Sequence, residues 1–236
     1  MNSLFYKDWY QNRVQKIINI FGKDWFAGKN ILELGACYGD IGFELMKLGA
    51  DVTFADARQE HLDVIESKFA NYSLVPDLIK LNQEEKYSLN KKYDLVLHLG
   101  VLYHIENWKQ DLECAMNHSD LMILETIVSH VKVPDRQIKN YGKGRVDKHN
   151  EKYEGINSIL NLNCQESIES QIIKNNGKFI RFDNQELNTT LSLDVEKNLI
   201  RHLYDWDYDS SVGINNQKRN QKNITNHFRR FWLVVK

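Results

Sequence analysis

The sequence predicts one α/β domain built on a doubly wound, mostly parallel sheet. Short aliphatic segments alternate with helical patterns between residues 30 and 126, and the connections between them are brief. A glycine turn, Gly35 to Gly39, follows the first of these segments directly. Polar side chains close several later segments, at the sheet edge where doubly wound proteins bind their ligands. Together these features predict a ligand at the carboxyl ends of the strands.

Length and composition narrow the class of protein. The 236 residues suffice for one domain with an appendage, and 42% hydrophobic and 27% charged residues exclude a mostly disordered chain. No apolar run approaches the ~20 residues that span a bilayer, and the first ten residues have no signal-peptide core. Cys37, Cys114 and Cys164 lack metal-ligand spacing and fit a reducing compartment. We therefore expect a cytoplasmic protein without membrane or metal.

The first half of the chain supplies three strands. Residues 1–28 form a lead-in segment with helical periodicity over 4–21, and its Trp9, Tyr10 and Arg13 belong either to a ligand pocket or to the core. Gly49 is a typical helix stop. The pattern then predicts strands at 31–34, 52–56 and 77–82 and helices at 40–48 and 58–70.

The second half continues the alternation as far as residue 126. Strands are expected at 93–99 and 120–126, with a helix from 106 or 107 to 116 between them. Right-handed crossovers place every strand's carboxyl end on one rim. The polar residues that fall near this rim are Glu33, Asp56, Asn82, His98 and Glu125.

A long polar segment, residues 127–163, interrupts the pattern. It contains Pro134 and a basic run, Lys132, Arg136, Lys139, Lys143, Arg145 and Lys148. Because it leaves from the rim, we interpret it as a lid over the ligand site; a solvated charged face is the alternative. Beyond it, the sequence predicts a helix at 165–176, a strand at 178–182, an irregular insertion at 185–227 with a helix at 193–204, and a final strand at 228–235.

The segment Ile31 to Gly42 carries the binding prediction. Its glycines permit a sharp bend and a close approach of the ligand, although many such turns serve packing alone. Glu33 is a charge inside a buried strand, so it needs a polar partner. Asp56 follows Gly35 by 21 residues and ends the next strand, the spacing at which a carboxylate accepts hydrogen bonds from a ribose. An adenosine-containing ligand is therefore expected.

The pattern Glu33-Leu34-Gly35 with Gly39 resembles the cofactor loop of class I S-adenosylmethionine-dependent methyltransferases. The resemblance covers nearly the whole chain and implies a seven-stranded Rossmann-like sheet with an antiparallel C-terminal strand. It also implies S-adenosyl-L-methionine as cofactor and S-adenosyl-L-homocysteine as product. By this resemblance Glu33 holds the amino end of the methionine part, Asp56 the ribose, and Asn82 and Gln83 flank the adenine.

The same resemblance assigns the rest of the cofactor site to neighbouring loop residues. These are Gly35, Ala36, Cys37, Gly39, Ala57, Leu99 and Gly100. Cys37 departs from the family pattern, because a glycine is common at its position.

A narrower resemblance concerns two segments, Gly100 to His104 and Leu124 to Val128, and the lead-in pair Arg13-Val14. They are similar to the bacterial enzymes that transfer a carboxymethyl group from carboxy-S-adenosylmethionine to the wobble uridine of tRNA. The sequence has no counterpart of the extra N-terminal region of those enzymes, and its loops after the fifth strand diverge. We interpret the likeness as shared ancestry of the core, which leaves open whether the donor is carboxylated.

The expected reaction is methyl transfer to an oxygen or nitrogen of an acceptor, in the first place a small molecule. His104 is the candidate general base and Tyr103 its neighbour in the site, although both residues can equally form a pocket wall. His98 is expected in the core, and Glu125 is expected to orient His104, bind the acceptor or cap a loop.

Three other functions stay open from the sequence. One is modification of the tRNA wobble uridine, with the RNA held by Lys132, Arg136, Lys139, Lys143 and Arg145. Another is a nucleotide-binding module without catalysis. The third, a dinucleotide-dependent oxidoreductase, is disfavoured because Glu33 would repel a pyrophosphate.

Overall fold

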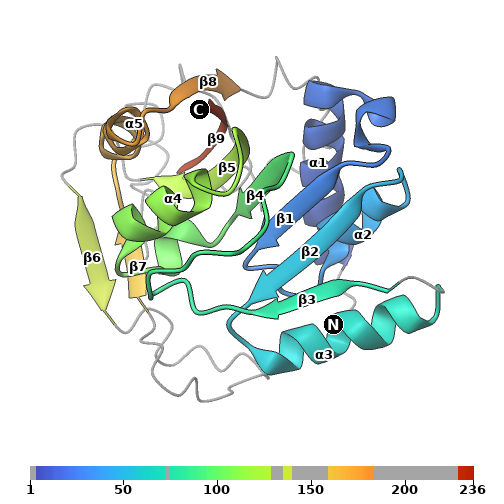
Figure 1. Ribbon diagram of the computed structural model, residues 1–236. Helices are drawn as coiled ribbons and strands as arrows, with labels where there is room; N and C mark the ends of the chain where they lie inside the picture. Colours follow the sequence, from blue (N-terminus) through green and yellow to red (C-terminus); the bar gives the residue numbers. More distant parts are fainter. Residues whose placement is uncertain (1–3, 73–74, 129–134, 140–158, 183–227) are drawn as a thin grey trace.

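The protein is built on one seven-stranded sheet, seen in a computed structural model that describes residues 4–72, 75–128, 135–139, 159–182 and 228–236 (Figure 1). The strand order is β3-β2-β1-β4-β5-β9-β8. The first five strands pair in parallel, and β9 pairs antiparallel with β5 on one side and β8 on the other. The strands are β1 (Asn30–Leu34), β2 (Asp51–Asp56), β3 (Asp77–Lys80), β4 (Leu95–Leu99), β5 (Leu121–Val128), β8 (Lys178–Phe182) and β9 (Phe228–Val235). The predicted doubly wound sheet with an antiparallel C-terminal strand is confirmed.

Helices cover both faces of this sheet (Figure 1). α1 (Leu4–Phe21), α2 (Asp40–Met46) and α3 (Gln59–Ala70) pack on one face, and α4 (Trp108–Met116) and α5 (Gln165–Lys174) on the other. Two short 3-10 helices, η1 (Lys23–Phe26) and η2 (Leu102–His104), complete the described part. Each predicted helix within the described residues is present, with ends one or two residues from the expected positions.

The alternation of side chains along the strands builds two separate cores. In β1, Ile31 packs with α1, α2 and α3, whereas Leu32 and Leu34 pack with α4 and α5. In β4, Leu97 and Leu99 face the first group of helices. These strands are apolar on both sides because helices bury both sides, as is usual for parallel sheets.

The predicted lid segment, residues 127–163, differs from the irregular segment expected. Val128 still belongs to β5, and the segment contains two strands, β6 (Arg136–Lys139) and β7 (Ile159–Leu162), which pair antiparallel. Four residues are too few for a period-two pattern to stand out from a polar loop. β7 contacts η2, so part of this segment lies beside Tyr103 and His104. The helix expected at 193–204 and most of the 185–227 insertion lie outside the described residues.

None of the helices in the described ranges combines the length and hydrophobicity needed to cross a lipid bilayer.

Candidate functional site

Four loops meet at the carboxyl edge of β3, β2, β1 and β4, which are neighbours in the sheet. These loops, with the last residues of the strands before them, carry all the predicted cofactor residues: Glu33, Gly35, Ala36, Cys37, Gly39, Asp56, Ala57, Asn82, Gln83, Leu99 and Gly100. Direct contacts join the loops. Ala36 N–H donates to Ala55 O (3.1 Å), Leu81 N–H donates to Asp56 O (3.0 Å), and a Cβ on Gly35 would lie 2.8 Å from Val101 Cγ2. The structure therefore places the predicted residues in one continuous strip.

The loop after β1 takes a left-handed backbone at every second residue. Gly35, Cys37 and Gly39 have φ values of 62°, 53° and 64°. Two of these positions hold glycine, which adopts this region without penalty, while a residue with a Cβ is strained there by about 1–2 kcal/mol. The unusual Cys37 therefore occupies a position with a physical preference for glycine.

Asp56 is tied into this loop by its side chain. Its Oδ2 accepts the Cys37 N–H (2.8 Å) and its Oδ1 accepts the Arg58 N–H (2.9 Å). Each carboxylate oxygen has two acceptor positions, so these bonds fix the carboxylate and leave capacity for a hydroxyl. The result is a pre-positioned acceptor at the end of β2.

Glu33 points from β1 towards the first turn of α2. Its Oε2 accepts the Gly42 N–H (2.9 Å), and its side chain is 4% exposed. Burial raises the pKa of Glu33 to about 8, against the lowering effect of that hydrogen bond; Asp40 adds to the rise, while Lys68 and Arg13 oppose it. A Cβ on Gly42 would lie 2.6 Å from Oε2, so glycine is what lets α2 come this close. The polar partner expected for Glu33 is a helix N-terminus.

Two side chains of α3 lie over the cofactor loop and were not anticipated. Lys68 donates to Asp40 Oδ1 (2.7 Å) and to the Tyr38 carbonyl. His61 Nδ1 lies 3.1 Å from Asp56 Oδ2, and its ring meets Tyr38 edge-on at 5.2 Å. They lie on the α3 face nearest the loop, which helical periodicity alone does not mark as a binding face.

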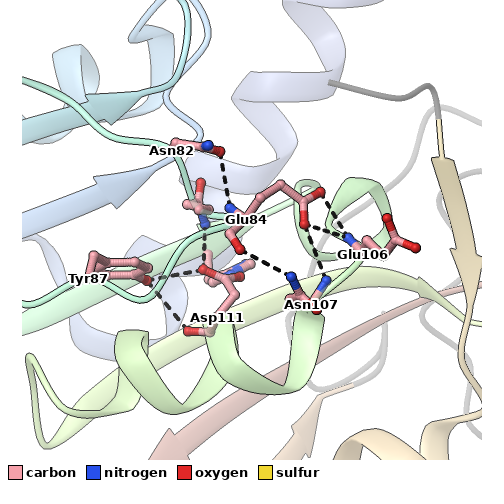
Figure 2. A network of polar contacts seen from close by, with 8 residues as sticks. Asn82, Glu84, Tyr87, Glu106, Asn107 and Asp111 are labelled. Carbon is pink, nitrogen blue, oxygen red and sulfur yellow. Dashed lines mark hydrogen bonds and ion pairs between the residues drawn. The ribbon is translucent and has the colours of Figure 1, made fainter. Parts of the chain in front are cut away.

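The two residues predicted to flank the adenine have different surroundings. Asn82 is exposed; its amide donates to Glu85 Oε1 (3.0 Å), and its Oδ1 accepts the Glu84 N–H (3.2 Å). Gln83 is buried, and its Nε2 donates to Asp111 Oδ1 on α4 (3.0 Å). Figure 2 shows this junction between the loop after β3 and the start of α4.

Arg13 of α1 lies against the ends of β4 and β5. It forms a buried ion pair with Glu125, and a Cβ on Gly100 would lie 2.5 Å from Arg13 Nη2. Gly100 N–H in turn donates to the Glu125 carbonyl (2.8 Å). Glu125 was expected to orient His104, bind the acceptor or cap a loop; the contact that the structure shows for its side chain is instead this ion pair with α1.

Lys16 lies one turn along α1 from Arg13 and is fully buried. Burial lowers the pKa of Lys16 to about 8; Glu125 opposes the shift and Arg13 adds to it. The sequence could have indicated the burial of Lys16, because this lysine stands between the apolar residues Val14 and Ile17 of an amphipathic helix, and both of these are buried.

The two candidate catalytic residues form η2, directly after the Gly100 turn. Tyr103 is buried and His104 is exposed, with ring centroids 4.1 Å apart. His98 lies deeper, fully buried in β4, with Nε2 2.7 Å from Asp111 Oδ2. The expectation that His98 is a hydrogen-bonded core residue is thus confirmed.

Two of the five predicted RNA-binding residues belong to the described part of the chain. Arg136 and Lys139 belong to β6, while Lys132, Lys143 and Arg145 lie outside the described residues.

Elsewhere, a groove of about 690 Å³ lies between residues 86–92, α4 and the end of α5. Its lining includes Lys86, Lys91, Lys92, Lys109 and Lys174. None of the predicted cofactor residues lines it. Across the described ranges, no three His, Cys, Asp or Glu side chains group as metal ligands.

Comparison with known proteins gives one distant sequence relative. No protein-family model matches the chain. Ubiquinone biosynthesis O-methyltransferase of Bartonella bacilliformis is 29% identical over 80 residues, which are 34% of this chain. The matched part spans about a third (32%) of that relative's length.

Solved structures resemble the chain over far more of its length. A S-adenosylmethionine-dependent methyltransferase from Clostridium acetobutylicum superposes with a TM-score of 0.59 at 15% identity, covering 96% of this chain and 91% of that one. Magnesium protoporphyrin IX methyltransferase from Synechocystis with bound SAH gives 0.59 at 13% identity, covering 100% and 89%. The [4+2]-cyclase SpnF gives 0.60 at 9% identity, covering 95% and 81%.

At these identities the likeness concerns the fold, and the cyclase illustrates that one fold carries different chemistries. The strand order, the antiparallel β9 and the superpositions agree: the chain has the Rossmann-like fold of the class I S-adenosylmethionine-dependent methyltransferases.

Proposed function

We propose that the protein is a methyltransferase that uses S-adenosyl-L-methionine to methylate an oxygen or nitrogen of a small-molecule acceptor. The observation that carries this proposal is the pair of acids at one edge of the sheet, Glu33 on β1 and Asp56 on β2, on either side of the left-handed loop 35–39. When bound, the cofactor supplies the methyl group on a sulfonium and leaves as S-adenosyl-L-homocysteine.

The residues at this edge fit the chemistry of that cofactor. The buried Glu33 carboxylate suits a cationic amino group, which would offset the burial that now raises its pKa. Asp56 is held by two backbone N–H groups and has acceptor positions left for ribose hydroxyls. A pyrophosphate at the same place would meet two carboxylates, which argues against a dinucleotide.

Methyl transfer is an in-line displacement, so the protein contributes mainly by orienting the acceptor and excluding water. η2 lies at the end of β4, where His104 is exposed to an incoming acceptor and Tyr103 forms the buried wall. His104 would take the proton from an acceptor hydroxyl or amine. The lid segment, residues 127–163, would cover this side, since β7 packs against η2.

Calorimetry with three ligands tests the cofactor. We expect binding of S-adenosylmethionine and S-adenosylhomocysteine and none of NAD. Binding of NAD alone would end the methyltransferase proposal, whereas binding of the sulfur compounds without turnover on any acceptor pool would favour a non-catalytic nucleotide-binding module. Mass spectrometry of metabolite and RNA pools incubated with labelled cofactor would then identify the acceptor.

Replacing His104 tests its role as a base. We expect His104→Ala to lower the rate of the chemical step by roughly 10²–10⁴-fold while affinity for the cofactor stays unchanged. Single-turnover rates and calorimetry separate the two effects. Turnover equal to that of the wild type would remove His104 as a base.

A second candidate acceptor is the wobble uridine of tRNA, with an ordinary or a carboxylated donor. It is supported by the similarity of residues 100–104 and 124–128 to that enzyme family and by the basic residues of the lid segment, two of which, Arg136 and Lys139, lie on β6. Contacts to phosphates would make tRNA affinity fall steeply with salt. An affinity that is flat with salt, or absent, would exclude this acceptor.

A further inference from the structure

A buried network joins the loop after β3 to the core of α4. Its centre is the Asp111 carboxylate, which is fully buried. Oδ1 lies 3.0 Å from Gln83 Nε2 and 3.1 Å from the Tyr87 hydroxyl, and Oδ2 lies 2.7 Å from His98 Nε2. Figure 2 shows Asp111 and Tyr87 meeting between the loop and the helix. Asp111 is thus surrounded by three side chains, two from the loop after β3 and one from β4.

The carboxylate only accepts hydrogen bonds, so each of its three neighbours must present a donor. Burial and Asp111 raise the pKa of Tyr87, which keeps its hydroxyl protonated. His98 Nδ1 has no hydrogen-bond partner among the described residues, so a proton there would be a buried donor without an acceptor. His98 therefore presents a proton on Nε2, the nitrogen that faces Asp111.

The same reasoning fixes the direction of the Gln83 amide. Turning the amide over would set Oε1 against Asp111 Oδ1, two acceptors in contact at a site that is 7% and 0% exposed. Within the described residues the amide is bonded through Nε2. Oε1 is then the end of the amide that is not bonded to Asp111, and it can only accept.

The loop that carries Gln83 contacts the acid proposed for the ribose. Leu81, two residues earlier, donates its N–H to the Asp56 carbonyl (3.0 Å). A nucleoside held at Asp56 would place its base beside the loop after β3. An acceptor fixed there favours a base that presents an amino group and opposes one that presents a carbonyl oxygen.

We propose that Asp111 and His98 are positioning residues that lock the Gln83 amide with Oε1 towards the cofactor site, and that this orientation selects a 6-aminopurine over a 6-oxopurine. The inference rests on the proposed function, because it assumes that an adenosine cofactor binds at this edge. It assigns no step in the chemistry to either residue.

The test compares the affinity for S-adenosylhomocysteine with that for its deaminated analogue, S-inosylhomocysteine, by calorimetry. Wild-type protein should prefer the adenine compound by roughly 10- to 100-fold, the effect of one mismatched hydrogen bond. In Asp111→Asn the new side chain can face Gln83 with either end, so the amide is released and the preference should fall towards one. Tyr87→Phe is the matched control: it removes another donor to Oδ1, leaves the Gln83 bond, and should keep the preference.

A merely structural network would lower both affinities together and leave their ratio intact. If Asp111→Asn does not fold, as judged by circular dichroism, Gln83→Leu provides the second variant, and its ratio should also approach one. The inference would be overturned if wild-type protein bound both compounds equally, or if folded Asp111→Asn kept the wild-type ratio of the two affinities. Either result would leave the proposed function standing. Wild-type protein that binds neither compound would overturn the proposed function and this inference with it.

Discussion

At the scale of single residues, Glu33 combines an unfavourable location with a defined partner. Its burial in β1 was visible in the sequence, because the acid stands between apolar residues of a short strand. The partner, the Gly42 N–H, was not visible, since it depends on how closely α2 approaches the sheet. The sequence could therefore predict that the Glu33 carboxylate needs a hydrogen-bond partner, but it could not identify that partner as the Gly42 N–H.

The raised pKa of Glu33 predicts a pH-dependent cost to stability. A folded-state pKa of about 8 against an ordinary value of 4.5 means that the folded protein binds the extra proton between these limits. The contribution of Glu33 to the free energy of unfolding is therefore fully present below pH 4.5, and it is lost as the pH rises to about 8. Glu33→Gln removes the titration, so its free energy of unfolding should exceed that of the wild type by about 2–5 kcal/mol at pH 8 and by much less at pH 5. Urea denaturation at both pH values measures this.

Glu60→Gln on the exposed side of α3 is the matched control and should show no such difference between the two pH values. An equal effect of Glu33→Gln at pH 5 and pH 8 would mean that the Glu33 carboxyl titrates normally. The same variant should bind S-adenosylhomocysteine more weakly, because it lacks the negative charge for the amino group.

At the scale of elements, the start of α4 is held by an acid from another loop. The Glu84 carboxylate accepts the N–H groups of Glu106 (2.9 and 3.0 Å) and Asn107 (3.2 Å), and Asn107 Nδ2 donates to the Glu84 carbonyl (3.2 Å; Figure 2). Asn107 is the residue directly before α4, and its N–H has no partner within the helix, so an acceptor there stabilises the helix start; the bonds to Glu106 fix the segment that leads into it. The loop after β3 therefore both carries Gln83 and caps α4.

Removing that cap should cost stability. Glu84→Ala is expected to lower the free energy of unfolding by about 1–2 kcal/mol, as measured by urea denaturation. Glu85→Ala is a control from the next position: Glu85 is exposed and accepts only the Asn82 amide in the described structure. We expect its effect to stay within about 0.5 kcal/mol. Equal losses in the two variants would argue against a capping role.

Elements with a strong periodic pattern were predictable, and short polar ones were not. The strands of the main sheet were predicted from apolar runs, whereas β6 and β7 were missed because their four-residue sequences include charged or polar positions. Asp111 was missed as a centre of the site, although it shares the buried face of α4 with Trp108, Leu112 and Ala115. An acid at helical spacing among apolar residues was the available signal.

At the scale of the whole molecule, the sheet depends on its C-terminal strand. β9 lies between β5 and β8, and its Trp232 is fully buried. Trp232 Nε1 donates to Glu169 Oε1 of α5 (3.0 Å), and the same carboxylate accepts two bonds from Arg181 of β8 (2.8 and 2.7 Å). The resemblance to a known family predicted this strand's place; its apolar sequence alone predicted only a strand.

Deleting residues 228–236 should abolish the cooperative fold, because it leaves β5 and β8 without their shared neighbour. We expect aggregation in size-exclusion chromatography and loss of the thermal transition in circular dichroism. Trp232→Phe keeps the strand but removes the indole N–H and part of a buried ring, so it should fold with a loss of about 1–3 kcal/mol. A truncated chain with the wild-type transition would show that β9 is dispensable.

The place of β9 also sets an order of events during synthesis. β5 ends at residue 128 and β8 at residue 182, yet the strand that joins them begins only at residue 228. A nascent chain therefore carries an open edge on β5 while the ribosome translates the intervening residues, a stage at which exposed edges invite wrong pairings. A finished chain diluted from denaturant has all seven strands present from the start. Folding on the ribosome and refolding in the test tube thus begin with different sets of partners.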